Sequence, residues 1–381
     1  MPAETHRIRG YDLARAIAIL AMVIVNYSVM MKIGGYPFAW IGHAVDFLFG
    51  RAATLFVMLA GVSVSLMAGS DTSPAAVRRL KTHFLKRGAL LLPAGLVLQH
   101  WWTADILHFY AAYLAVAAWL VCWPSRRLLW TTVALILISL PVSATLTIAY
   151  DLDYLPAELQ NRGFLPALLG GYLAGNYYPL LPWLGYFLAG MLLGRVQPAS
   201  PAFYKRCVWG GLLVCLAVEL FSYTQVSWIK QQIWDMEGDW WLTFFRSEAF
   251  PVTPLFIFSS GACALAVIGL CRLATEGPQG RSLQSRWPGP LVAFGQLSLT
   301  MYIAHLLWGW ACMSLARRTG IDIRPGYMFA AALGFYAAAI PSAWYWRRFF
   351  RRGPLEALFH LMITNAGIPI FKPRVAHQTL R

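Results

Sequence analysis

The chain has 381 residues, of which 59% are hydrophobic and only 12% charged, and its formal net charge is +15. A soluble globular domain carries about 25% charged residues, so this composition excludes that class and predicts a polytopic, all-α membrane protein. The basic residues lie in short segments between apolar runs, which indicates membrane topology as the origin of the charge and predicts no nucleic-acid partner.

Ten apolar segments are candidate transmembrane helices. They lie near residues 11–31, 45–68, 85–101, 104–123, 128–149, 180–196, 207–224, 252–271, 291–312 and 326–346. Lys and Arg favour one set of connecting segments over the other by about three to one, which predicts that both termini are cytoplasmic. We expect one transmembrane domain over residues 1–358, with outer loops at about 150–179 and 225–251, and a basic cytoplasmic tail over 359–381.

The first apolar segment begins with charged side chains, at Arg7, Arg9, Asp12 and Arg15. A charge at the bilayer centre costs from about 3 to more than 10 kcal/mol, so this helix is expected to line something polar. Guanidinium groups pair well with phosphate oxygens, which suits a nucleotide site. The alternative is structural: topology-determining residues with an Asp12–Arg15 pair at the start of the helix.

Arg51 lies inside the second segment, five positions after Asp46. A buried guanidinium at this depth needs either a carboxylate or a ligand anion.

The predicted topology places several polar side chains in the outer half of the membrane: Asn26, His43, Asp46, His100, Asp105, His108 and His305. A histidine of near-neutral pKa accepts a proton from an amine or hydroxyl nucleophile. His43 and Asp46 are three residues apart and share a helix face, so the carboxylate is placed to orient the imidazole. The alternative for each histidine is an interfacial side chain bonded to a carbonyl, and for Asp105–His108 a structural pair.

The six cysteines lie in or beside apolar runs and show no metal-binding spacing. We expect small buried hydrophobic side chains, with no disulfide and no metal.

Several ordered motifs of the N-terminal half resemble the heparan-α-glucosaminide N-acetyltransferase family. They are Arg7-x-Arg9-x-x-Asp12-x-x-Arg15, Val25-Asn26-Tyr27, His43 and Phe56-x-Met58-x-x-Gly61-x-Ser63. Later motifs are similar to the related DUF418 (YeiB-like) membrane proteins: Asp105-Ile106-Leu107 before Tyr110, Leu181-Pro182-Trp183-Leu184-Gly185, Gly190-Met191-x-x-Gly194-Arg195, Gly295-Gln296-Leu297-Ser298-Leu299-Thr300-x-Tyr302 and Arg352-Gly353-Pro354-Leu355-Glu356.

The resemblance implies transfer of an acyl group from cytoplasmic acyl-CoA to an acceptor on the opposite face, typically a sugar. It implies that the family's functional Asn falls on Asn26 and its essential His on His43.

Our leading hypothesis is therefore an acyl-CoA-dependent acyltransferase in the bacterial plasma (inner) membrane, acting on an amine or hydroxyl of an extracytoplasmic sugar or glycan. His43 is the expected base, Asn26 the oxyanion donor and Asp46 the orienting carboxylate. The expected donor site comprises Arg7, Arg9, Asp12, Arg15 and Arg51, and the expected acceptor-side residues are Asp105, His108 and His305.

Several alternatives stay open. In a mechanistic variant, His43 is acylated first and then passes the acyl group on. A transporter or exporter of a polar or anionic solute would use the histidines as a proton relay. A non-catalytic membrane scaffold is a third class, and a homo-oligomer is compatible with all three.

Overall fold

The computed structural model describes residues 8–69, 73–151, 177–196, 199–232, 242, 244–250, 252–276 and 289–364. The chain folds into two compact units. Unit 1 comprises Met1–Leu48 and Ala274–Arg381, and unit 2 comprises Phe49–Leu273. The single domain expected over residues 1–358 stays a prediction.

The all-α prediction is confirmed: the described elements are helices, and the only other pairing among them is an isolated bridge between Ala249 and Val252. All ten predicted segments are helical. Within the described residues, seven helical segments are long and apolar enough to cross a membrane, and the protein is therefore polytopic. These segments are Arg9–Met30, Ala39–Ala68, Ser125–Thr145, Pro201–Ile229, Pro254–Thr275, Ser298–Thr319 and Pro325–Phe349.

The other three predicted segments are helices that are short or charged. Helices α5 (Leu107–Leu120) and α9 (Leu180–Arg195) have 14 and 16 residues. At 1.5 Å per residue they are about 21 and 24 Å long, less than the hydrocarbon thickness of about 30 Å. Helix α4 (Pro74–Trp101) is longer, but its first half carries five basic residues.

Two predicted segments are interrupted. The segment 45–68 divides into α2 (Ala39–Leu48) and α3 (Arg51–Ala68), with Gly50 at φ +71° between them. That left-handed backbone favours glycine, and a Cβ at Gly50 would also collide with Ala249 and Phe256. The segment 291–312 likewise divides at Leu297 into α13 (Gly289–Gln296) and α14 (Ser298–Thr319). An additional helix, α16 (Pro354–Thr364), was not predicted.

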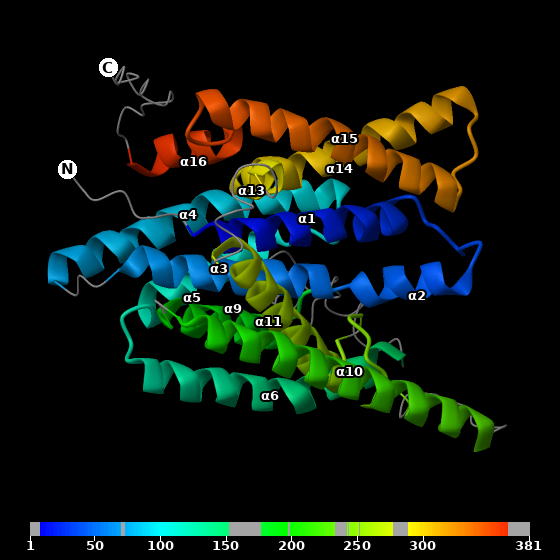
Figure 1. Ribbon diagram of the computed structural model, residues 1–381, viewed down its shortest axis with the longest axis horizontal. Coiled ribbons are helices and arrows are strands. Elements are labelled where there is room, and N and C mark those ends of the chain that lie inside the picture. The colour runs from blue at the N-terminus through cyan, green and yellow to red at the C-terminus, as the bar shows by residue number, and fades with distance from the viewer. Residues whose placement is uncertain are drawn as a thin grey trace, which may run out of the picture. The chain divides into compact units, whose positions relative to one another are not determined.

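Unit 1 is built around α1 (Arg9–Met30), which packs against α13, α14 and α15 (Pro325–Phe349) (Figure 1). Glycines allow close approach: a Cβ at Gly295 of α13 would collide with the carbonyl of Asp12, and one at Gly309 of α14 would press on Tyr27. The Tyr336 hydroxyl donates to the Leu20 carbonyl at 2.6 Å, which joins α15 to α1. The packing therefore brings the C-terminal helices onto the helix that begins with charge.

In unit 2, glycines likewise allow close approach at three helix pairs. Helix α3 packs on α9, where a Cβ at Gly61 or Gly190 would collide with a facing carbonyl. Gly95 holds α4 close to α5, and Gly211 and Gly269 hold α10 (Pro201–Gln232) close to α11 (Pro254–Glu276). Helix α6 (Ser125–Asp151) packs on α9 as well. Small residues at helix contacts are typical of membrane bundles, because close van der Waals packing stabilises helix association in lipid.

Candidate functional site

A buried amide–imidazole pair lies in unit 1. Asn26 of α1 is 9% exposed and His305 of α14 is fully buried. The Asn26 Nδ2 atom lies 2.9 Å from His305 Nε2, and the Tyr27 hydroxyl donates to the His305 carbonyl at 2.8 Å. Both residues were expected in the same layer, but their direct hydrogen bond, across 279 positions, was not predicted.

His43 and Asp46 lie on α2 of the same unit, and both side chains are exposed. Among the described residues, no hydrogen bond joins His43 to Asp46 or to Asn26. Their common helix face follows from the spacing of three residues. Their assigned roles as base and orienting carboxylate stay predictions.

A chain of polar contacts lies at the N-terminal end of α1. Arg15 forms an ion pair with the fully buried Asp12, as the structural alternative required. The Gln296 amide donates to the second Asp12 oxygen at 3.1 Å, and Arg347 donates to the Gln296 oxygen at 2.7 Å. Asp12 is thus enclosed and orients Arg15, whose side chain is 18% exposed. Arg9 is exposed, and Arg7 lies outside the described residues.

Glu356 of α16 caps the first turn of α14. One carboxylate oxygen accepts from the backbone N–H of Leu299 at 2.8 Å and of Thr300 at 3.2 Å, and the other accepts from the Thr300 hydroxyl. A carboxylate at a helix N-terminus satisfies unpaired N–H groups and complements the helix dipole. Both segments carry motifs of the family resemblance, but the contact between them was not predicted. The cap sets the start of the helix that carries His305.

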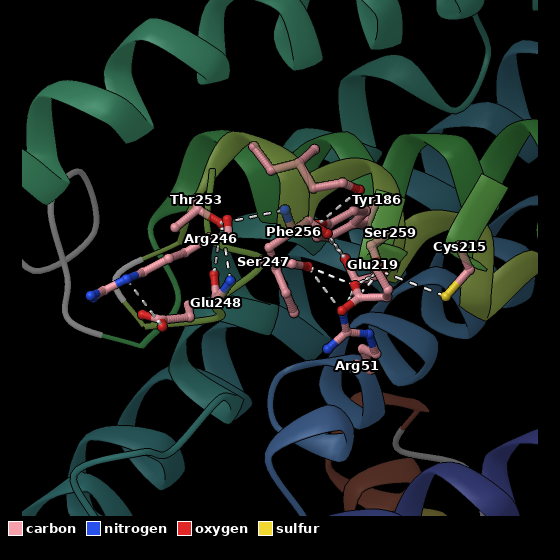
Figure 2. A network of polar contacts seen from close by, with 12 residues as sticks. Arg51, Tyr186, Cys215, Glu219, Arg246, Ser247, Glu248, Thr253, Phe256 and Ser259 are labelled. Atoms are coloured by element: carbon pink, nitrogen blue, oxygen red, sulfur yellow. Dashed lines mark hydrogen bonds and ion pairs between the residues drawn. The ribbon is translucent and has the colours of Figure 1, made fainter. Parts of the chain in front are cut away.

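Arg51, in unit 2, has a protein carboxylate as its partner (Figure 2). It forms an ion pair with Glu219 of α10 and donates to Ser247 at 3.1 Å and Ser259 at 2.9 Å. The Phe256 ring lies 5.2 Å from the guanidinium carbon, within cation–π range. Of the two alternatives for Arg51, a carboxylate or a ligand anion, the structure has the carboxylate. Glu219 was missed, although a lone Glu inside the apolar segment 207–224 was a usable signal.

The loop that supplies Ser247 is itself held in place. Ser247 and Ser259 donate to the same Glu219 oxygen that Arg51 contacts. The Thr253 hydroxyl donates to the Arg246 carbonyl at 2.7 Å and accepts from the Glu248 N–H at 3.1 Å (Figure 2). These bonds join α3, α10, α11 and the loop before α11 in one hydrogen-bonded cluster, in which Arg51 is buried and Glu219 is partly exposed.

Asp105 and His108 form a buried pair at the start of α5, in unit 2. Asp105 Oδ2 lies 3.3 Å from His108 Nδ1 and accepts from the Leu107 N–H at 3.0 Å. Both side chains are buried, and Asp105 satisfies the Leu107 N–H group in the first turn of α5. Beside it, burial and then the Asp105 charge raise the pKa of the Tyr178 phenol, which therefore stays protonated. Their assigned acceptor-binding role stays a prediction.

The predicted site residues are thus distributed over both units. Unit 1 holds Asp12 with Arg15, Asn26 with His305, and His43 with Asp46, whereas Arg51, Asp105 and His108 belong to unit 2. All six cysteines are free thiols. Within the described ranges, no group of three potential ligands gathers in a geometry that could hold a metal ion.

Comparison with known families accounts for nearly all of the chain. The family model described as heparan-alpha-glucosaminide N-acetyltransferase, catalytic, matches residues 7–216, more than half of the sequence. The model of a protein family of unknown function, DUF418, matches residues 193–365. No curated protein matches the chain. Because that first match covers more than half of the sequence, the chain belongs to the heparan-α-glucosaminide N-acetyltransferase catalytic family, a family of membrane acetyltransferases.

Proposed function

We propose that this protein transfers an acetyl or other acyl group from cytoplasmic acyl-CoA to an amine or hydroxyl of an acceptor, a sugar or glycan, at the outer face of the bacterial plasma membrane. The observation that carries this proposal is the buried Asn26 amide, held by His305 inside a helix of a membrane acetyltransferase family. A buried amide is costly unless its polar atoms have partners. His305 is one partner of the Asn26 amide, and the reacting thioester would be another.

In the proposed reaction, the acceptor nitrogen or oxygen attacks the thioester carbonyl carbon and loses its proton to His43. The carbonyl oxygen becomes an oxyanion, which accepts a hydrogen bond from the Asn26 amide. Collapse of this intermediate breaks the carbon–sulfur bond and releases the CoA thiolate, which takes the proton from His43. A single oxyanion donor contributes about 3–4 kcal/mol, and a general base about 10²–10⁴-fold.

The proposed donor site lies at the inner end of α1. The exposed Arg9 and the partly exposed Arg15 would hold the CoA phosphates, together with Arg7, while Asp12 orients Arg15. Arg15 and Asn26 are eleven residues apart on one helix, which is about 16 Å along its axis. An extended pantetheine arm can bridge that separation. We leave Arg51 out of this site, because Glu219 neutralises it.

Binding and transfer assays on the purified protein test this proposal. We expect CoA to raise the melting temperature, since a ligand at 100 times its Kd stabilises by about 2.7 kcal/mol. With acetyl-labelled acetyl-CoA and glucosamine as the probe acceptor, the wild type should form labelled product. His43→Ala and Asn26→Ala should lose transfer and keep the CoA-induced shift. No shift and no transfer by the wild type would contradict the proposal and favour the transporter alternative.

A further inference from the structure

We infer that His305 is a positioning residue that sets the orientation of the Asn26 amide, so that one amide N–H always faces the reacting carbonyl oxygen. This inference rests on the proposed acyl transfer. It assigns His305 to Asn26, in place of the acceptor-side role that the sequence suggested. The relevant contact lies wholly within unit 1, between α1 and α14.

The contact with Asn26 shows which nitrogen of the His305 ring carries the proton. The ring is fully buried, so the neutral imidazole is favoured over the cation. An amide nitrogen can only donate a hydrogen bond, so Nε2, which faces Asn26 Nδ2, is the unprotonated nitrogen and accepts it. The proton of the neutral ring is therefore on Nδ1.

This tautomer in turn holds the amide in the observed orientation, with Asn26 Nδ2 2.9 Å from the Nε2 lone pair. A rotation of the amide by 180° would place Asn26 Oδ1 against the Nε2 lone pair, with two acceptors in contact. The second N–H of Nδ2 is not engaged by the described residues and can donate to the oxyanion. His305 thereby provides a donor that needs no reorientation during the reaction.

The imidazole is itself held in place. The Tyr27 hydroxyl donates to the His305 carbonyl. The centroid of the imidazole ring lies 5.3 Å from that of Tyr302 and 6.3 Å from that of Phe335. Glu356 caps the beginning of α14, two turns before His305. The pair therefore consists of two side chains whose positions are both determined by packing and hydrogen bonds.

Two amide substitutions of similar size separate the roles of the two ring nitrogens. Glutamine places its terminal amide near the position of Nε2, whereas asparagine reaches only to the position of Nδ1. We expect His305→Gln to keep transfer within about tenfold of the wild type. His305→Asn and His305→Phe should lower kcat by about 10²–10³-fold, the loss typical of an oxyanion donor, with little change in the KM for acetyl-CoA. The double variant Asn26→Ala/His305→Phe should be no slower than Asn26→Ala alone.

The outcomes separate this inference from the proposed function. An active wild type with full activity in His305→Asn or His305→Phe overturns the role of His305 and leaves the proposed function intact. Multiplicative losses in the double variant also overturn it, because they mean that His305 does not act through Asn26. A wild type that binds CoA without transferring any acyl group overturns both. Melting curves identify misfolded variants, and if His305→Phe does not fold, the two amide variants alone decide.

Discussion

Arg51 of α3 and Glu219 of α10 form an ion pair inside unit 2, and Ser247 and Ser259 donate to the same carboxylate oxygen. Arg51 is 5% exposed and Glu219 30% exposed. Removing one member of such a pair leaves a buried charge without compensation, whereas replacing both members with apolar side chains is often nearly neutral.

We therefore expect Glu219→Gln to destabilise the protein by about 3 kcal/mol, the lower end of the range for buried pairs, because Glu219 is partly exposed. The double variant Arg51→Met/Glu219→Leu should recover most of that loss. Thermal unfolding in one detergent measures both effects. Equal melting temperatures for the wild type and Glu219→Gln would show that the pair does not stabilise the fold. Unchanged CoA binding in the double variant would confirm that Arg51 lies outside the donor site.

The N-terminal end of α1 provides a prediction about the binding of the acyl donor. Arg15→Ala should weaken CoA binding about tenfold or more, because a charge-assisted hydrogen bond contributes about 1.5–3 kcal/mol. Arg324→Ala is the control, since Arg324 is an exposed arginine that pairs with Asp322 before α15. Isothermal titration with CoA measures both. An Arg15→Ala protein that binds CoA as tightly as the wild type would leave the Asp12–Arg15 pair with a structural role alone.

Adjacent glycines in α10 form a matched test of helix packing. A Cβ at Gly211 would collide with the Ala262 carbonyl of α11, whereas a Cβ at Gly210 would meet nothing within 4 Å. Gly211→Ala should destabilise by about 1–3 kcal/mol through overpacking. Gly210→Ala should be neutral or stabilise by up to about 1 kcal/mol, because alanine is the better helix former. Similar melting temperatures for the two variants would mean that α10 and α11 do not pack closely at Gly211.

The Glu356 cap on α14 predicts that two substitutions of Glu356 destabilise the protein to different extents. Glu356→Ala removes the acceptors for the Leu299 and Thr300 N–H groups and should cost about 1–2 kcal/mol. Glu356→Gln keeps an acceptor oxygen but loses the favourable charge at the helix N-terminus, so its loss should be smaller. Thermal unfolding ranks the three proteins. A Glu356→Gln protein less stable than Glu356→Ala would contradict this account of the cap.

Much of the architecture could be predicted from local pattern. Each apolar segment is helical because its backbone groups must be satisfied within the segment when water is excluded. The same reasoning found Asp12 and Arg15, three residues apart on one helix face, and they do pair. A buried guanidinium is costly alone, so Arg51 was also expected to have either a carboxylate or a ligand anion as its partner. Prediction was weaker at the interruptions near Gly50 and Leu297, which hydropathy averaged over a window does not detect.

The sequence by itself thus determined the class of the protein, its helical segments and the residues whose burial demands a partner. Only the tertiary structure decided which partner each one has. Glu219 is 168 positions from Arg51, and His305 is 279 positions from Asn26. Such pairs depend on which helices pack together and at what rotation. That packing arises from many weak contacts and close glycine approaches spread over the unit, and no local pattern in the sequence encodes it.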